Sequence, residues 1–422
     1  MTTRRAGARP LTARAVAYEV VLRVFEDGAY ADRAFRAVAS GLDERDRAFA
    51  MELAYGTVRR ARTLDYAIEA LGRRPVRRLD PPVRAALRLG AYQLGFMGAV
   101  PSHAAVNESV ELVRSAGLER AVAFANAVMR RVAAGLEALL AELGEETPDA
   151  AALKHSYPDW IAETWWRELG PAEAVALMRA QNEPAETVVR VNRRRVESLP
   201  GERDRELPDA LRVERIPDDW LANGLVWPQS RASQLAGLCV GAGPGERTLD
   251  LCAAPGGKAT QLDGDVVAVE KNKDRARELE AMVALLGASN VSVVHGDGLS
   301  LPAALRDFDR ALVDAPCSGL GVLAGRPDLR WRAKPLPELQ LALLEAAAER
   351  VRPGGTVVYS ACTISAQENE AVVDALGLPV DDLGAVWPRY RHPRRPEFLL
   401  TLPHRDGTAG FFVARLLCPG RP

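Results

Sequence analysis

Two cysteines of this chain stand where an apolar run of the sequence ends. Cys317 lies three residues after the run Arg310–Asp314, and Cys362 directly follows the run Thr356–Ala361. Runs of this kind predict buried strands, and in an open α/β sheet ligands bind at the carboxyl ends of the strands. Each thiol is therefore a candidate nucleophile, although a buried and inert cysteine is the alternative for either one taken alone.

A glycine turn forms the second chemical feature. The stretch from Thr248 to Lys258 has the sequence Thr-Leu-Asp-Leu-Cys-Ala-Ala-Pro-Gly-Gly-Lys. It predicts a short strand that contains Asp250 and continues into a turn at Pro255–Gly257. The glycines carry no Cβ, so the backbone of such a turn can approach a ligand closely. The spacing differs from the G-x-G-x-x-G of dinucleotide sites, which disfavours a nicotinamide or flavin, and a purely structural turn is the alternative for this stretch alone.

Acidic residues end three of the predicted strands. Glu270 comes about twenty residues after Asp250, the position from which an acid in this type of sheet binds ribose hydroxyls. Asp297 and Asp314 end two later runs. Together the runs predict one sheet with functional groups along a single rim. They cover residues 249–252, 266–269, 291–297, 310–314 and 356–361.

Three stretches of this part resemble the signature motifs of the Sun/Fmu-type RNA cytosine-C5 methyltransferases. They are Asp250–Lys258, Asp314-Ala-Pro-Cys-Ser-Gly319 and Tyr359-Ser-Ala-Cys-Thr363. The resemblance implies an α/β Rossmann-like class I methyltransferase domain that uses S-adenosylmethionine. Together with the strand-end acids, it assigns cofactor binding to Asp250, Cys252, Ala253, Ala254, Pro255, Gly256, Gly257, Lys258, Glu270, Asp297 and Asp314. No metal is expected, because no His/Cys cluster has zinc spacing.

Four side chains would carry the chemistry that the resemblance implies. Carbon 5 of cytosine is a poor nucleophile, and a thiolate that adds at carbon 6 makes it reactive towards a sulfonium methyl group. The residues alone leave open which cysteine attacks, whereas the resemblance assigns the attack to Cys362 and product release to Cys317. It places Lys258 near the cytosine and Asp314, whose carboxyl group would stabilise the charge created by addition. A solvated lysine is the alternative for Lys258.

The segment from residue 11 to 145 shows helical spacing of apolar residues and no strand pattern, which predicts a separate all-α bundle. Four of its stretches resemble the NusB-like RNA-binding domain, which precedes the catalytic domain in Sun/Fmu-type bacterial 16S rRNA methyltransferases. These stretches are 46–50, 55–60, 100–108 and 124–131. Paired arginines at 59–60 and 130–131 suit RNA phosphates, and a solvated charged face is the alternative.

The chain is expected to divide into four parts. They are a flexible basic arm at 1–10, the NusB-like domain at 11–145, a linker with a small α/β RNA-contacting subdomain at 146–224, and the catalytic domain at 225–422. Only eleven residues separate Lys258 from Glu270, which leaves room for little more than one helical turn after the glycines. Arg330–Arg332 mix charge with an aromatic ring and are interpreted as part of an RNA-binding wall.

The composition of the chain bears on its number of domains, its partners, its disulfides and its location. A chain of 422 residues with 48% hydrophobic types suffices for two or three domains, and a net charge of −1 indicates no particular partner. Five cysteines without paired spacing predict no disulfide framework, and neither a signal peptide nor a membrane span is expected. The resulting expectation is a cytoplasmic monomer that acts on 16S rRNA in an unassembled or partly assembled small subunit. A tRNA substrate, or an inactive RNA-binding antitermination factor, are the alternatives.

Overall fold

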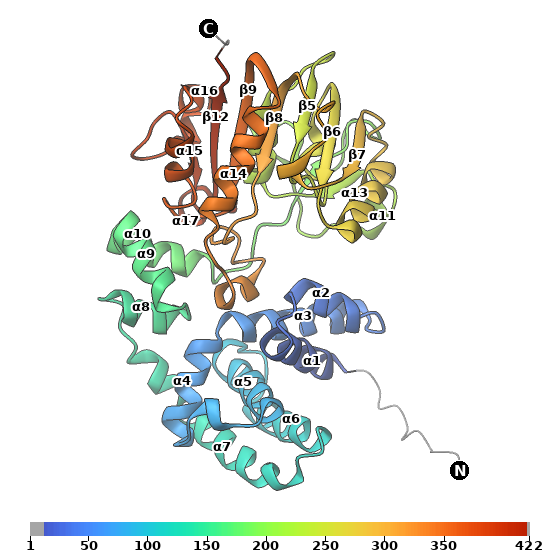
Figure 1. Ribbon diagram of the computed structural model, residues 1–422. Helices are drawn as coiled ribbons and strands as arrows, with labels where there is room; N and C mark the ends of the chain where they lie inside the picture. Colours follow the sequence, from blue (N-terminus) through green and yellow to red (C-terminus); the bar gives the residue numbers. More distant parts are fainter. Residues whose placement is uncertain (1–11, 420–422) are drawn as a thin grey trace. The chain divides into compact units, whose positions relative to one another are not determined.

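The structure, a computed structural model, describes residues 12–419, so the basic arm expected at residues 1–10 lies outside the described part. The chain divides into two compact units. The first takes the chain up to Asn182 together with Arg326–Arg332, and the second takes Glu183–Gly325 and the chain from Ala333 onwards. In Figure 1 the described first unit consists of helices, and the second is built around a sheet.

The first unit confirms the all-α bundle predicted from the helical spacing. Side chains cap the N-termini of α1 and α3, because the Thr12 side chain accepts a hydrogen bond from the Ala15 amide and the Asp43 side chain accepts one from the Asp46 amide. Its helices are α1 (Ala13–Glu26), α2 (Ala31–Val38), α3 (Glu44–Arg59), α4 (Ala61–Gly72), η1 (Val76–Arg78), α5 (Pro81–Phe96), α6 (Ser102–Ser115), α7 (Glu119–Ala141), α8 (Pro148–His155), α9 (Asp159–Leu169), α10 (Pro171–Ala180) and η4 (Pro327–Trp331).

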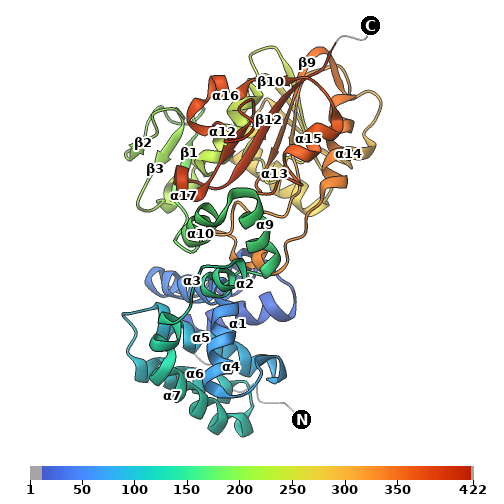
Figure 2. The ribbon, with the colours of Figure 1, turned by 90° about the vertical axis from the view of Figure 1, so that its left-hand side faces the viewer.

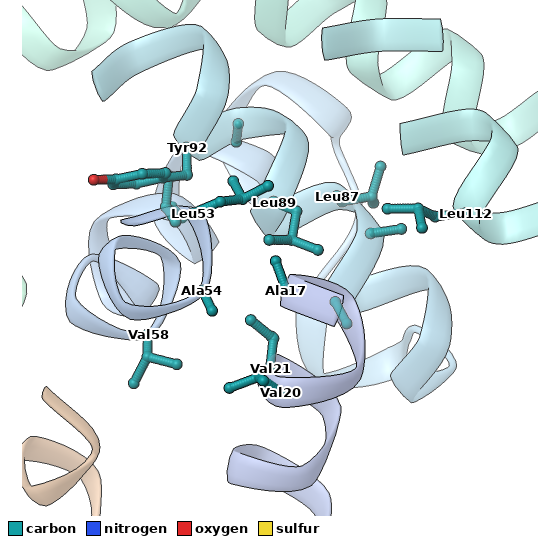
Figure 3. Packing of buried hydrophobic residues seen from close by; sticks show 14 of the residues in the cluster. Ala17, Val20, Val21, Leu53, Ala54, Val58, Leu87, Leu89, Tyr92 and Leu112 are labelled. Carbon is teal, nitrogen blue, oxygen red and sulfur yellow. The ribbon is translucent and has the colours of Figure 1, made fainter. Parts of the chain in front are cut away.

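The core of this bundle depends on close approach between α3 and α5. Figure 3 shows side chains of α1, α3 and α5 meeting in one apolar cluster, with the Tyr92 ring of α5 beside α3. A Cβ added to Gly56 would lie 2.0 Å from the Tyr92 ring. Glycine at this position therefore lets the two helices pack at a distance that any larger residue would prevent.

The segment Arg326–Arg332 groups with the helical unit although it follows the Cys317 loop in sequence. Arg330 is 1% exposed and donates to the Gln181 carbonyl at 2.8 Å, while the Trp331 indole N–H donates to the Val58 carbonyl at 2.8 Å. The interpretation of Arg330 as part of an RNA-binding wall is wrong, because its side chain is buried within the helical unit. Trp331 is half-buried and Arg332 is exposed, so for these two residues the interpretation stays a prediction.

The second unit is organised around an eight-stranded mixed sheet. Its main path runs β10 (Val380–Asp381), β12 (Phe411–Leu417), β9 (Val351–Ala361), β8 (Phe308–Asp314), β5 (Arg247–Asp250), β6 (Asp265–Glu270), β7 (Val291–His295), and β11 (Leu399–Thr401) pairs with β12. The five strands from β9 to β7 are parallel, and β12 joins β9 in antiparallel pairing. All five predicted runs are strands of this sheet, and the Rossmann-like α/β prediction is confirmed.

Helices cover both faces of the sheet. In Figure 2, α12 (Arg231–Val240) lies on one side and α14 (Pro337–Ala348) on the other. The other helices around the main sheet are η2 (Ala259–Gln261), α13 (Lys273–Leu286), η3 (Gly298–Ser300), α15 (Glu370–Leu376), α16 (Leu383–Val386), η5 (Pro388–Tyr390) and α17 (Pro403–Asp406). As the short spacing predicts, the turn after the glycines is a single 3₁₀ turn, η2.

A small sheet precedes the catalytic sheet in the second unit. Its order is β2 (Glu202–Arg203), β3 (Ala210–Arg212), β1 (Val188–Val191), β4 (Val226–Pro228), with α11 (Asp218–Ala222) between β3 and β4 in sequence. The four-part division of the chain remains a prediction. The two units divide its third part, residues 146–224, because α8 to α10 group with the helices and β1 to β4 with the catalytic sheet. No helix of residues 12–419 is long and apolar enough to cross a membrane.

Candidate active site

The two candidate nucleophiles lie next to each other at the rim of the sheet. Strands β8 and β9 pair in parallel with Asp314 opposite Ser360, so the loops that follow both strands start side by side. The sulfur atoms of Cys317 and Cys362 are 3.3 Å apart. Neither cysteine forms a disulfide. One thiol can therefore donate a hydrogen bond to the sulfur of the other, whether that sulfur is a thiol or a thiolate.

The two thiols differ in how readily they ionise. The hydrogen bond from Cys317 lowers the pKa of Cys362, and the Lys258 cation contributes in the same direction. The same hydrogen bond, together with burial, raises the pKa of Cys317. Because the thiolate is the nucleophilic form of cysteine, the arrangement favours Cys362 as the attacking group and Cys317 as its protonated partner.

An ion pair lies on the same rim. The Lys258 ammonium group donates to Asp314 at 2.6 Å, and the Ser360 hydroxyl donates to the other oxygen of Asp314 at 2.8 Å. Lys258 is only 7% exposed, and its Nζ atom lies 4.9 Å from the centre of the Phe411 ring. The solvated-lysine alternative is therefore wrong. Phe411 was not singled out from the sequence, because its contact with Lys258 depends on how the distant strand β12 pairs with β9.

A buried carboxylate that the sequence interpretation missed holds the Cys317 loop. Glu368 is fully buried and accepts hydrogen bonds from the Ser318 amide at 3.0 Å and the Leu336 amide at 3.1 Å. It also accepts from the Ser318 hydroxyl and from Gln340. Its sequence surroundings, Gln-Glu-Asn-Glu, are typical of an exposed helix start, so no local signal separates it from a surface acid. Glu368 fixes the backbone that presents the Cys317 thiol.

The glycine turn follows β5 as predicted. Gly256 has φ +107°, a backbone conformation that favours glycine, and a Cβ there would lie 2.5 Å from Leu279. Before it, the Ala253 amide donates to Val269 and the Ala254 carbonyl accepts from Arg275. Cys252, Ala253, Ala254, Pro255 and Gly257 thus lie between the ends of β5 and β6, and burial raises the pKa of the Cys252 thiol.

Asp250 is a buried acid at the start of this turn. It is 1% exposed, and neither carboxyl oxygen makes a well-formed hydrogen bond with another described residue. Burial, reinforced by the negative charge of Asp314, raises the pKa of Asp250 to about 7. Unpaired acceptors in such a place fit a ligand that brings a donor or a positive charge, as the amino and sulfonium groups of S-adenosylmethionine would.

The two remaining acids lie at the ends of β6 and β7. Glu270 is 5% exposed, accepts from the Asn272 amide at 2.8 Å and has Arg275 3.7 Å away. Asp297 pairs with Lys271 at 2.7 Å and accepts from the Leu299 amide, and these two hydrogen bonds lower its pKa. Both acids therefore lie on the β6–β7 side of the rim, where their roles towards ribose and adenine remain predictions.

The rim as a whole brings together groups suited to covalent group transfer. It holds a pair of thiols, an acid–lysine pair beside them, and a glycine turn with an unpaired acid on the neighbouring strand. All eleven candidate cofactor residues and all four candidate catalytic residues belong to the second unit. Their placement on one sheet edge follows from the parallel pairing of β7, β6, β5, β8 and β9.

Sequence comparison with known proteins independently supports a NusB-like part and a methyltransferase part in this chain. Residues 239–417 match the family model of the 16S rRNA methyltransferase RsmB/F, and residues 11–134 match the NusB family. A probable ribosomal RNA small subunit methyltransferase B of Synechocystis sp. is 34% identical, and the match covers 96% of this chain and 99% of that protein. Ribosomal RNA small subunit methyltransferase B of Thermus thermophilus is 36% identical, with 96% and 97% covered.

A solved structure agrees with these matches at the level of the fold. The crystal structure of PH0851 is similar with a TM-score of 0.80 and 23% identity, and the match covers 98% of this chain and 100% of that one. At this identity the likeness concerns the fold alone. The curated relatives, by contrast, match in sequence over nearly their whole length. The chain therefore belongs to the RsmB/F family of methyltransferases, with a NusB-like helical domain before its Rossmann-like catalytic domain.

Proposed function

We propose that this protein transfers a methyl group from S-adenosylmethionine to carbon 5 of a cytosine in 16S rRNA. The observation that carries the proposal is the pair of thiols 3.3 Å apart, one of them with a lowered pKa, beside the Lys258–Asp314 pair. The membership in the RsmB/F family supports an RNA substrate, and the names of the curated relatives support small-subunit rRNA.

The reaction begins with the thiolate of Cys362. Its sulfur forms a bond to carbon 6 of the cytosine, the double bond between carbons 5 and 6 opens, and the electron pair moves to carbon 5. A proton shared between the Asp314 carboxyl group and the ring nitrogen N3 neutralises the negative charge that addition creates, and Asp314 also accepts a hydrogen bond from the exocyclic amine. Lys258 holds Asp314 in place through their ion pair.

S-adenosylmethionine, when bound, supplies the electrophilic methyl group that carbon 5 accepts. Asp250, the glycine turn, Glu270 and Asp297 are the residues proposed to hold it. Elimination then reverses the addition, because a base removes the carbon-5 proton, the double bond re-forms and Cys362 leaves as a thiolate. Cys317, or a water molecule that it activates, assists this release.

The reacting cytosine must be accessible to the thiolate. A base inside a duplex cannot be reached, so the target is unpaired or flipped out of its stack. We therefore propose that the enzyme acts as a monomer on rRNA that is unassembled or partly assembled. A cytoplasmic location fits this substrate and fits five unpaired cysteines, since thiols stay reduced there.

A labelling experiment tests this proposal. Wild type, Cys362→Ala and Cys317→Ala are incubated with methyl-tritiated S-adenosylmethionine and unmodified 16S rRNA transcript, and methyl transfer and denaturation-resistant protein–RNA adducts are scored. We expect transfer by wild type, none by Cys362→Ala, and an accumulated adduct with Cys317→Ala, because release fails while addition proceeds.

Other outcomes would change the assignment in defined ways. An adduct with Cys362→Ala and none with Cys317→Ala would reverse the roles of the two thiols. Binding of 16S rRNA by wild type without transfer would overturn the rRNA assignment. The same assay with tRNA would then distinguish a different substrate from a catalytic domain that has lost its activity.

A further inference from the structure

The turn after the two glycines lacks the helix that usually follows the first strand of a doubly wound sheet. In its place stands η2, one 3₁₀ turn over Ala259–Gln261. In a longer helix the backbone carbonyls of this region would accept hydrogen bonds from amides one turn further along. Here the carbonyls of Gly257, Thr260 and Leu262 find other donors, which are Arg190 of β1, Arg194 just after β1, and Asn290 just before β7.

Arg190 of β1 supplies the first of these donors. One nitrogen of its guanidinium group donates to the Gly257 carbonyl at 2.5 Å, and another donates to the Thr260 hydroxyl at 2.7 Å. The side chain is 4% exposed and makes no ion pair with a carboxylate among residues 12–419. Burial lowers the pKa of Arg190 to about 10, so the group remains a cation at neutral pH and binds the turn with charged hydrogen bonds.

Arg194, which lies four residues further along the chain, supplies a second set of hydrogen-bond donors. It donates to the Thr260 carbonyl at 2.7 Å and to the side-chain oxygen of Asn290 at 3.1 Å. The amide nitrogen of Asn290 in turn donates to the carbonyls of Leu262 and Gly264. The two arginines and Asn290 thus satisfy the carbonyls on both sides of η2.

Trp227, the aromatic residue of β4, packs against the same turn. A Cβ added to Gly257 would lie 3.0 Å from the indole nitrogen of Trp227. The small sheet therefore meets the turn with both a hydrogen-bonding strand, β1, and a packing strand, β4. Gly257 has little freedom to move towards the small sheet while Arg190 holds its carbonyl.

We infer that Arg190 and Arg194 are positioning residues that hold the cofactor turn in place of the missing first helix. The inference rests on the proposed use of S-adenosylmethionine. It gives the small sheet a role in cofactor affinity, separate from any contact that this sheet makes with RNA. Arg190 is the principal group, because its hydrogen bond reaches the residue directly before Lys258.

Calorimetric titration of the full chain with S-adenosylmethionine tests the inference. The variants are Arg190→Ala and Arg190→Lys, and the matched control is Arg310→Ala. Arg310 is also a partly buried arginine that donates to a backbone carbonyl, at Val240, but it lies near the opposite end of β8 from Asp314. Thermal unfolding of each variant is measured alongside, and guanidinium ion at low millimolar concentration is added to Arg190→Ala.

We expect the dissociation constant for S-adenosylmethionine to rise about ten- to a hundredfold in Arg190→Ala. Arg190→Lys should recover only part of the affinity, since an ammonium group cannot reach both acceptors in the fixed geometry of a guanidinium. Guanidinium ion should restore affinity to Arg190→Ala. Arg310→Ala should unfold at a lower temperature and bind with unchanged affinity.

The outcomes separate this inference from the proposed function. If wild type itself does not bind S-adenosylmethionine, the proposed function fails. If wild type binds and Arg190→Ala binds equally well, the positioning role is refuted and the proposed function stands. Weakened binding that guanidinium ion leaves uncorrected, in a variant as destabilised as Arg310→Ala, would show a general packing role and would equally overturn the inference.

Discussion

Two buried arginines, one in each unit, have no carboxylate partner within residues 12–419, and they do different things. Arg190 is 4% exposed and bonds to two neighbouring points of one turn. Arg330 is 1% exposed and joins segments that are far apart in the sequence. Its acceptors are the carbonyls of Arg59, His155, Ser156 and Gln181 and the side-chain oxygen of Asn182.

The two environments lower the pKa of both arginines, to about 10 for Arg190 and about 9 for Arg330, because burial disfavours the charged form. Carbonyl dipoles and, for Arg330, the Tyr157 ring 3.9 Å away replace a counter-ion. The two side chains differ in how many segments of the chain they contact. Arg190 shapes a single loop, so its loss should act mainly on ligand binding, whereas Arg330 joins several segments, so its loss should act mainly on folding.

The largest expected effect is therefore on stability, at Arg330. Arg330→Ala removes a donor from each of these five acceptors, and we expect the free energy of unfolding of the helical unit to fall by roughly 3–5 kcal/mol. Chemical denaturation followed by circular dichroism measures this change. Arg332→Ala is the control, because Arg332 is exposed and donates only to Gly28 at the surface. Equal midpoints for both variants would refute the contrast with Arg190.

A smaller effect is expected at Asp250, the buried acid beside the turn that Arg190 holds. Its folded pKa of about 7 lies above the ordinary value of 3.8, so the folded state retains a proton that the unfolded state has lost. Stability should fall as pH rises from about 4 to 7 and change little above. Asp250→Asn should remove this slope, raise Tm at pH 8 by roughly 5 °C, and weaken S-adenosylmethionine binding.

Melting curves of wild type and Asp250→Asn at pH 4.5 and pH 8 test whether ionisation of Asp250 lowers the stability. The gain from Asp250→Asn should be large at pH 8 and about a quarter as large at pH 4.5. A gain of the same size at both pH values would mean that ionisation of Asp250 is not the cause. Unchanged cofactor affinity in the variant would separate Asp250 from the cofactor.

The smallest effect should be confined to the thiol pair. Removing the hydrogen bond from Cys317 should raise the pKa of Cys362, because that bond is the main influence lowering it. In Cys317→Ala, the rate of Cys362 alkylation by iodoacetamide should therefore rise at a higher pH than in wild type. Alkylation of Cys362 is followed by mass spectrometry of the peptide that contains it. A shift towards lower pH would contradict the assignment of Cys317 as the proton donor.

The sequence predicts the placement of the rim residues well because its signals are local. Apolar runs, the glycine turn and the residue that ends each strand lie within a few positions of one another, and parallel pairing brings such ends together. Glu368, Phe411 and Arg190 could not be found in this way. Each acts on a residue at least tens of positions away, and nothing in its own surroundings separates it from an ordinary surface or core residue.

The misinterpretation of Arg330 has the same origin. A mixture of arginine and tryptophan suits both RNA stacking and the packing of a buried anchor. Only the acceptors around the side chain distinguish the two, and these come from Arg59, from α8 and from residues 181–182. The prediction of a short turn after Gly257 succeeded, by contrast, because the distance along the chain alone set an upper limit on its length.

The return of Arg326–Arg332 to the helical unit has a consequence for synthesis on the ribosome. A chain grows from its amino terminus, so the helices up to Asn182 leave the ribosome long before residue 332 is made. Until then the acceptors of Arg330 lack their donor, and the amino-terminal unit is incomplete. The hydrogen bonds that join residues 155–182 to α3 are therefore completed by a segment encoded inside the second half of the gene, and a fragment cut at Asn182 would lack the side chain that makes them.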